Sequence, residues 1–405
     1  SKGGKIVLAG GADTNADGIP DGYAWNNKSN TQAGVMLGEI GGRGSSVNLL
    51  SGGGDIIIRG YTSGSSPFPG IATQKSFKID SGTGTIQIVG GSLTSHGYEF
   101  VYGVEADFFI TSASTSSTAI SISGTTSVAG YTGGIVASRT GSYVIQSTAS
   151  TGGGIQMIGS NLAATGRQLY LSGAGGTAYI LSQNGPISFA GTGGNNGLIN
   201  EGAIKLGSHA LVSVSGVNTS VYSSSSNISL TSDYFSFGTN SAVKTTGSLT
   251  IEPNGNSFAG TQTLSNLSFS GNESQFNLGK ASNTADLTIS SAVSTAGPIS
   301  ITAGTIAVNE NINTSAGTTN GDILLKSSGD ISVAENKSIT TSGGDVVLWS
   351  NSDGQTTNGS IKLTNGASIV TGSSTVAGGA IWLGGGSTAT TWKGLSVGNG
   401  YAVSG

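Results

Sequence analysis

The feature that most constrains this chain is a short run of alternating apolar residues that recurs along its whole length. Each run is opened by Gly or Gly-Asp and closed by Gly, Ser, Thr or Asn. Examples are GGKIVLAGG, GGDIIIRG, GTIQIVGG, GDILLKS and GGDVVLW. Alternation with a period of two between turn residues is typical of short β-strands, and no stretch has a helical period. The sequence therefore predicts an all-β chain.

Composition decides between an ordered and a disordered chain. Gly accounts for 70 of 405 residues and charged residues for only 9%, so the usage is not that of an ordinary globular protein. However, Ile, Val, Leu, Phe and Tyr recur throughout, and a net charge of -4 is too small to keep the chain open. Burial of these side chains can offset the conformational entropy lost on folding, so we expect a folded chain.

Several classes of function are excluded by what the sequence lacks. The chain has no cysteine, which rules out disulfides, thiolate metal sites and cysteine nucleophiles. Its mildly acidic balance, without a cluster of Lys or Arg, argues against nucleic acid as a partner. No apolar run approaches the roughly 18 residues of a membrane-spanning helix. The chain starts at Ser1 without a leader, and we expect a mature or excised piece of a secreted protein.

Strand runs without intervening helices favour a parallel β-solenoid over a row of β-sandwiches, because no linker or composition shift marks domain boundaries. We expect a right-handed parallel β-helix, an elongated rod in which residues 1–405 form one continuous solenoid. Asp322, Asp345 and Ser368 precede apolar pairs at a constant step of 23 residues. This step predicts one coil per roughly 20 to 23 residues and about 18 coils in all.

A longer repeat joins the two ends of the sequence. The stretch GKIVLAGG, residues 4–11, matches GAIWLGGG, residues 379–386, so residues 343–405 are expected to resemble the start of a next repeat. Neither end carries a polar capping element, which a solenoid needs to protect its edge strands. We therefore expect these residues to be one segment of a longer repetitive chain.

Residues 302–354 read TAGTIAVNENINTSAGTTNGDILLKSSGDISVAENKSITTSGGDVVLWSNSDG. This stretch resembles the repeat region of very large bacterial exoproteins, the filamentous-haemagglutinin-like adhesins. The resemblance is strongest from about residue 285 to 385 and rests on repeat style rather than on a catalytic motif. It implies a secreted solenoid shaft at the cell surface that serves attachment, aggregation or biofilm formation. The amino-terminal secretion domain of that family is not recognisable here.

The stretch DTNADGIPDGYAW, residues 13–25, has the oxygen spacing of a calcium loop. The candidate ligands are Asp13, Asn15, Asp17 and Asp21. Gly18 stands where such loops turn sharply, but Ala24 replaces the usual acidic residue at position 12. A bound ion would be structural rather than catalytic. The alternative is an Asx-rich turn in which Asp and Asn side chains bind their own backbone.

The stretch HGYEFVYGVEADFF, residues 96–109, is the most aromatic and acidic part of the chain. Alternation places Glu99, Glu105 and Asp107 on one face, which would suit a polysaccharide-active β-helix enzyme. The alternative is the solvated outer face of a buried strand. We predict no catalytic residue: GLSVG, residues 394–398, matches a nucleophile elbow only by chance, and His96 and His209 stand in unrelated contexts.

Four tryptophans, Trp25, Trp349, Trp382 and Trp392, lie in the two end regions that resemble each other. We expect them to pack in the core or between coils, although exposed aromatic rings can also stack on sugars. The sequence as a whole predicts an adhesive or structural shaft without enzymatic activity. Its partners would be glycans, surface polymers or sister chains, bound through many weak contacts. A polysaccharide lyase or hydrolase and a self-assembling filament or sheath are the alternatives.

Overall fold

The computed structural model describes most of the chain. The described residues are 3–26, 33–37, 47–63, 68–73, 77–93, 95, 97–100, 108–128, 133–137, 143–163, 167–171, 177–192, 196–200, 203–207, 210–214, 217–221, 227–239, 241–314, 321–355 and 359–403. Within these ranges there is no helix, and strands are joined by turns and irregular segments. The prediction of an all-β chain is confirmed. The structure divides into two compact units, Ser1–Ser241 (unit 1) and Ala242–Gly405 (unit 2).

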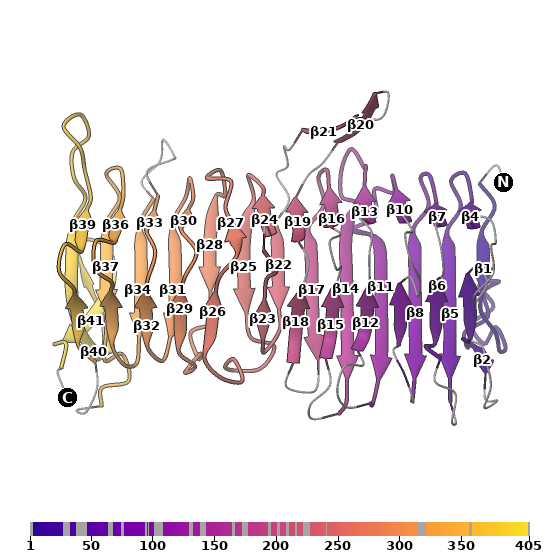
Figure 1. Cartoon of the computed structure of the whole chain (residues 1–405), viewed down its shortest axis with the longest axis horizontal. Coiled ribbons are helices and arrows are strands. Elements are labelled where there is room, and N and C mark those ends of the chain that lie inside the picture. Colours follow the sequence, from indigo (N-terminus) through magenta and orange to yellow (C-terminus); the bar gives the residue numbers. More distant parts are fainter. Residues whose placement is uncertain are drawn as a thin grey trace. The chain divides into compact units, whose positions relative to one another are not determined.

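Unit 1 contains three parallel sheets that the chain visits in turn (Figure 1). The long sheet of unit 1 comprises β1 (Ile6–Leu8), β5 (Ile56–Thr62), β8 (Ile86–Ser92), β11 (Thr118–Thr126), β14 (Gly154–Asn161), β17 (Ile187–Thr192) and β22 (Ile228–Thr231). The second sheet comprises β3 (Val35–Leu37), β6 (Ile71–Thr73), β9 (Tyr98–Phe100), β12 (Gly133–Ala137), β15 (Arg167–Leu171), β18 (Asn196–Asn200) and β23 (Phe235–Ser236). The third sheet includes β4 (Val47–Leu50), β7 (Phe77–Asp80), β10 (Phe108–Ser112), β13 (Tyr143–Ser147), β16 (Thr177–Ser182) and β19 (Ala203–Gly207). One passage through the three sheets forms a coil, which is consistent with a β-solenoid.

Two elements of unit 1 stand apart from this circuit. The short strand β2 (Ala24–Asn26) pairs in parallel with the end of β5. The strands β20 (Ala210–Val214) and β21 (Val217–Val221) form an antiparallel hairpin of their own.

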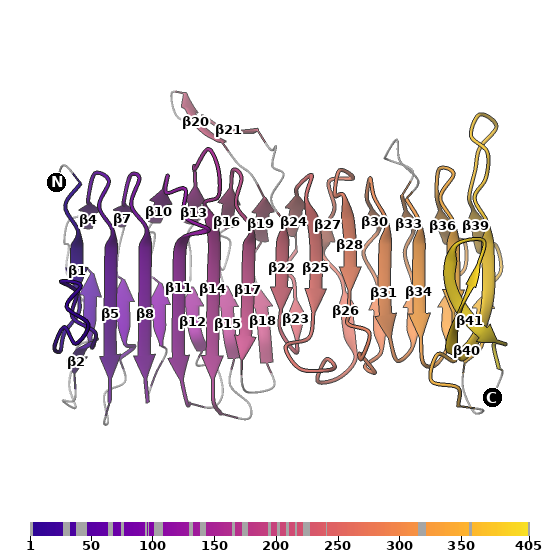
Figure 2. The ribbon, with the colours of Figure 1, turned by 180° about the vertical axis from the view of Figure 1, so that it is seen from behind.

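Unit 2 repeats the circuit, and the first five strands of its long sheet have only four or five residues. Its long sheet comprises β25 (Ser248–Glu252), β28 (Gln275–Leu278), β31 (Ile299–Ala303), β34 (Ile323–Ser327), β37 (Val346–Trp349) and β40 (Ile381–Trp392). Its second sheet comprises β26 (Gln262–Leu264), β29 (Leu287–Ile289), β32 (Ile306–Val308), β35 (Ile331–Val333) and β38 (Ile361–Leu363). The remaining strands are β24 (Ser241–Lys244) with β27 (Leu267–Ser268), and β30 (Val293–Ser294), β33 (Ile312–Asn313), β36 (Ser338–Thr340) and β39 (Ser368–Val370). A final strand, β41 (Leu395–Gly400), folds back antiparallel to β40 (yellow in Figure 2).

The number of residues per coil differs between the units. In unit 2, Ile323 pairs with Val346, a step of 23 residues that agrees with the prediction. In unit 1, Ile86 pairs with Ile120, a step of 34 residues. In unit 1 the prediction of roughly 20 to 23 residues per coil is therefore wrong. The predicted total of about 18 coils is wrong for the same reason. One reason is strand length: β8 and β11 have 7 and 9 residues, whereas β28 and β31 have 4 and 5.

The predicted 23-residue repeat of Asp322, Asp345 and Ser368 is also correct only in part. Asp322 and Asp345 do lie at equivalent positions, before β34 and β37. Ser368 instead belongs to β39 and pairs with Ser338 in another sheet. The true counterpart of Asp345 in the next coil is Ala380, 35 residues further on. The error arose because apolar pairs look alike in the sequence whichever sheet they join.

The interior of each unit consists of columns of apolar side chains, one from each coil. Inward residues of the long sheet are at most 1% exposed: Ile56, Ile86, Ile120, Ile155, Ile187 and Ile228 in unit 1, and Phe276, Ile299, Ile323 and Val346 in unit 2. Each buried side chain of this size contributes about 1.5–3 kcal/mol relative to exposure. The apolar positions of the short runs therefore supply the core, as the alternation predicts.

Buried hydroxyl groups form further columns where the third sheet turns toward the long sheet. The serine ladder of unit 1 is Ser51, Ser81, Ser112, Ser147 and Ser182, and the threonine ladder of unit 2 is Thr295, Thr314, Thr341 and Thr371. The Ser81 hydroxyl donates to the carbonyl of Gly84 at 2.6 Å, and the Thr295 hydroxyl donates to that of Gly297 at 2.7 Å. These bonds satisfy buried carbonyl groups at the corners of the coils.

Candidate functional site

The predicted calcium loop is held together by hydrogen bonds from its own backbone N–H groups to its Asp and Asn side chains. Asp13 accepts hydrogen bonds from the N–H groups of Asp17 at 3.2 Å and Gly18 at 2.7 Å. Asn15 also accepts from the N–H of Asp17 at 3.1 Å, and Asp17 accepts from the N–H of Ile19 at 2.8 Å. Gly18 has a φ of 79°, as a sharp turn at this position requires. These are the bonds of an Asx-rich turn, the alternative that the sequence left open.

Asp21, the fourth predicted ligand, closes the same loop. Its Oδ2 accepts from the hydroxyl of Thr14 at 2.5 Å and from the backbone N–H of Thr14 at 2.7 Å. These two bonds, assisted by the positive charge of Arg59, hold the pKa of Asp21 below its usual value. Asn15 Nδ2 lies 3.4 Å from Asp21 Oδ1.

The oxygen atoms of this loop are of the type that calcium prefers, and these four side chains are the predicted ligands. Over the part of the chain that the structure describes, however, no three His, Cys, Asp or Glu side chains converge as metal ligands do. Calcium at Asp13, Asn15, Asp17 and Asp21 stays a prediction.

A second set of carboxylates links each coil to the next. In these inter-coil aspartates, Oδ1 of a residue just before a strand accepts a hydrogen bond from a backbone N–H one coil further on. The pairs are Asp55 with Thr85 (2.9 Å), Asp286 with Thr305 (2.8 Å), Asp322 with Asp345 (2.8 Å), Asp330 with Ser360 (2.6 Å) and Asp345 with Ala380 (2.5 Å). The Gly-Asp openings in the sequence marked several of these positions, but only as strand boundaries.

Asp330 has the largest number of donors among the inter-coil aspartates. It accepts from the N–H of Gly359 at 3.1 Å and from both the N–H and the hydroxyl of Ser360, at 2.6 and 2.8 Å. Partial burial raises the pKa of this carboxyl, but the bonds from Ser360 and Gly359 together outweigh burial and hold the pKa below its usual value. Asp330 is therefore ionised and bonded to the next coil at neutral pH.

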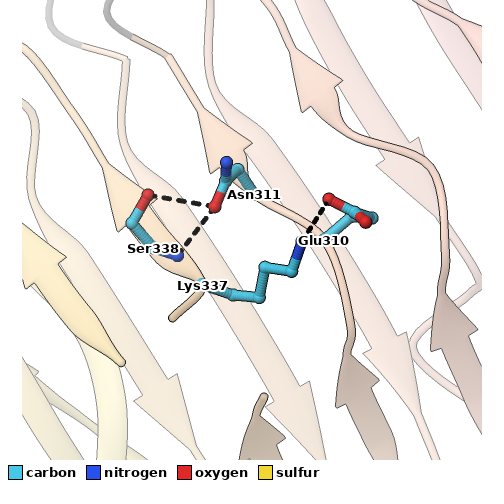
Figure 3. A network of polar contacts seen from close by, with 4 residues as sticks. All are labelled: Glu310, Asn311, Lys337 and Ser338. Atoms are coloured by element: carbon cyan, nitrogen blue, oxygen red, sulfur yellow. Dashed lines mark hydrogen bonds and ion pairs between the residues drawn. The ribbon is translucent and has the colours of Figure 1, made fainter. Parts of the chain in front are cut away.

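Polar side chains on the outside of unit 2 make similar contacts (Figure 3). Lys337 Nζ lies 2.8 Å from a carboxylate oxygen of Glu310, and Asn311 Oδ1 accepts from the N–H of Ser338 at 2.9 Å. The donor and the acceptor come from successive coils in both contacts. Exposed ion pairs of this kind contribute less than about 1 kcal/mol each, so their effect depends on repetition.

A surface hollow of about 520 Å³ lies over the outer face of β7 and β10. The strand register places Lys78 beside Phe109, and Asp80 beside Thr111. Lys78 and Asp80 form an ion pair at 3.0 Å, and the ring of Phe109 is 37% exposed. Gly82, Ala113 and Thr148 complete the rim.

The volume of the hollow falls in the range of small-ligand sites, and its lining combines one apolar ring with several polar groups. Thr111 Oγ1 is buried at its edge and has no hydrogen-bond partner among the described residues. The hollow was not predicted from the sequence. Cross-strand pairing of Lys78 with Phe109, 31 positions apart, could not be inferred before the register was known.

Three of the four tryptophans pack as predicted. Trp349 is buried with Val347 and Val397, and Trp382 and Trp392 cover the same cluster. The β40–β41 hairpin is fixed over this cluster by a hydrogen bond from Trp349 Nε1 to the carbonyl of Gly386 at 2.8 Å. Trp25 does not follow the prediction, because its side chain is 65% exposed.

Among the remaining catalytic candidates, the GLSVG stretch is the one whose side chains are described. Residues 394–398 form a hairpin turn and the strand β41, not the strand, turn and helix of a nucleophile elbow, so the match is accidental as expected. Glu105, Asp107, His96 and His209 lie outside the described residues, and of Glu99 only the backbone, in β9, is described.

No helix within the described ranges is long and apolar enough to cross a bilayer. Comparisons of the chain with protein-family models, with curated proteins and with solved structures find no significant match.

Proposed function

We propose that this chain is a segment of a secreted bacterial cell-surface protein, an adhesive or structural shaft of the filamentous-haemagglutinin-like kind. In this proposal the coils wind in the right-handed sense that crossovers between parallel strands almost always take. The shaft mediates attachment, aggregation or biofilm formation, and its partners are glycans, other surface polymers or sister chains.

The inter-coil aspartates are the observation that supports this proposal most directly. Carboxylates at Asp55, Asp322, Asp330 and Asp345 are engaged by backbone N–H groups of the following coil. Carboxylates are also the side chains that a polysaccharide-cleaving site would use. Here their described contacts stabilise the stacking of coils, which is what a shaft requires of every repeat.

The outer surface supports the adhesive part of the proposal. Charged residues make up only 9% of the chain, so Ser, Thr, Asn and Gln supply much of its hydrogen-bonding capacity. Such groups bind sugar hydroxyls weakly one at a time. Repetition along many coils can raise the total affinity by avidity.

The proposal is tested by passing a panel of bacterial, plant and algal polysaccharides over the immobilised chain and measuring retention and polymer length together. We expect retention of at least one polysaccharide without shortening, with the heat-unfolded chain as the control. Shortened polymers would overturn the proposal in favour of an enzyme, and mutagenesis of Glu99, Glu105 and Asp107 would follow. Absence of retention together with concentration-dependent association in light scattering would replace glycan adhesion by self-assembly.

A further inference from the structure

We propose that Tyr23, Trp25 and Tyr61 of unit 1, called here the aromatic platform, form a carbohydrate-binding site. The inference rests on the proposed adhesive function and assigns it to a particular place on the surface. The ligand class is a polysaccharide of low charge, with one sugar ring stacked on the aromatic faces.

The platform is assembled by strand pairing between β2 and β5. Trp25 lies directly beside Tyr61 in the register of these two strands. The ring centroids of Trp25 and Tyr61 are 5.1 Å apart with the planes tilted by 59°, and those of Tyr23 and Tyr61 are 5.7 Å apart with a tilt of 50°. Trp25 and Tyr23 are 65% and 39% exposed. Three aromatic rings thus meet at an angle on the surface, with two of them open to solvent.

The rings of Trp25 and Tyr61 are held in place before any ligand arrives. The indole N–H of Trp25 donates to the hydroxyl of Ser63 at 3.0 Å. Tyr61 lies against Gly91 in the neighbouring strand β8, so closely that a Cβ on Gly91 would stand 2.5 Å from a ring carbon. Side chains that are already ordered lose little entropy on binding, which favours measurable affinity from a small contact area.

Polar groups border the platform on the same face of the sheet. Arg59 precedes Tyr61 by two residues in β5 and therefore points to the same side. Its guanidinium donates to the carbonyl of Pro20 at 2.9 Å and to Gln87 Oε1 at 3.0 Å. The phenol hydroxyls of the tyrosines add donors and acceptors to this border.

This combination of features fits a sugar ring better than other ligands. Two exposed rings and one partly buried ring fall far short of the roughly 1,000 Å² that a stable protein interface buries. Nucleic acid would require a cluster of positive charge, and the net charge of the chain is -4. A pyranose presents an apolar face of C–H groups and an edge of hydroxyls, which matches aromatic faces bordered by polar groups.

The test measures binding of the intact chain to cellulose, xylan, galactomannan, dextran and chitin by affinity electrophoresis and pull-down. The difference in tryptophan fluorescence between the natural chain and Trp25→Ala reports contact at the platform. The variants are Trp25→Ala, Tyr61→Ala and Gly91→Ala, of which the last displaces the Tyr61 ring without removing it. Tyr401→Ala is the matched control, because Tyr401 is 87% exposed and belongs to unit 2, whereas the platform belongs to unit 1. Circular dichroism of each variant shows whether the fold is retained.

We expect the platform variants to weaken binding of the retained polysaccharide at least tenfold and the Tyr401 variant to change it less than twofold. Ligand should also shift the tryptophan emission of the natural chain to the blue, and this shift should be absent in Trp25→Ala. Unchanged binding in folded Trp25→Ala and Tyr61→Ala variants would overturn the platform and leave the proposed function standing. Loss of binding on Phe109→Ala alone would move the site to the hollow over β7 and β10. Failure to retain any polysaccharide, or binding of a polyproline peptide alone, would overturn the carbohydrate assignment.

Discussion

Oδ1 of Asp322 lies 2.8 Å from the backbone nitrogen of Asp345, the residue at the same position in the next coil of unit 2. The second aspartate repeats the contact toward Ala380. Side chains at the start of the long-sheet strands therefore continue the backbone hydrogen bonding between coils beyond the strands themselves. Because each such bond joins residues more than 20 positions apart, removing one should weaken the contact between two particular coils.

Asp330→Ala should lower the free energy of unfolding of unit 2 by about 1–3 kcal/mol, because donors from Gly359 and Ser360 lose a charged acceptor. Urea unfolding followed by circular dichroism measures the change. Asp353→Ala is the control, since Asp353 accepts from the nearby N–H of Gln355 at 3.1 Å in an exposed turn and, among the described residues, makes no bond to another coil. A loss in the control equal to that of Asp330→Ala would show that the inter-coil contact is not the cause.

The contribution of Asp330 should depend on pH in a defined direction. Burial raises its pKa, but the hydrogen bonds from Ser360 and Gly359 outweigh burial, so the folded-state pKa lies below the usual pKa of an aspartate. The unfolded chain then binds more protons in this range, so the stabilisation is complete above a pH of about 4–5 and is lost as the pH falls through the folded pKa. Urea midpoints of the natural chain and of Asp330→Asn should differ most near neutral pH and converge as the pH falls through the folded-state pKa of Asp330. A difference that stays constant over this range would contradict the prediction.

Two serines in the same ladder should respond in opposite ways to replacement by alanine. Ser182 donates to the carbonyl of Gly153 at 3.1 Å and accepts from the N–H of Gly185 at 2.9 Å. Ser182→Ala should therefore cost about 1–3 kcal/mol. Ser147 pairs with Ser182 one coil away, but its hydroxyl is buried without a hydrogen-bond partner among the described residues. Ser147→Ala should be neutral or slightly stabilising, and thermal melts of both variants provide the comparison.

The calcium loop makes a prediction that separates ion binding from a simple turn. If Asp13, Asn15, Asp17 and Asp21 bind calcium, titration calorimetry should show one saturable event that Asp17→Ala abolishes. At about a hundred times the dissociation constant, calcium should add about 2.7 kcal/mol to the stability of unit 1. Asp353→Ala, in the other unit, should bind calcium like the natural chain. Equal stability in calcium and in a chelator would identify the loop as an Asx-rich turn.

Much of the local structure could be read from the residues. Runs such as GGDIIIRG around Ile56 and Ile58 became strands with these side chains inward, because alternation specifies which side of a strand is buried. Packing of Trp349 was anticipated as well. The candidate sites were anticipated less well, since the hollow beside Phe109 and the exposure of Trp25 both depend on neighbours from other coils.

The sequence by itself determined that this chain forms short strands, that glycine and small polar residues separate them, and that apolar side chains from every run enter a common interior. These properties are local, since they depend on alternation and turn chemistry within a few residues. Only the tertiary structure decided which sheet each run joins, how long each coil is, and that Trp25 meets Tyr61 from 36 positions away. Parallel pairing is non-local, and many runs carry the same pattern, so the register follows from the packing of whole coils rather than from any single stretch.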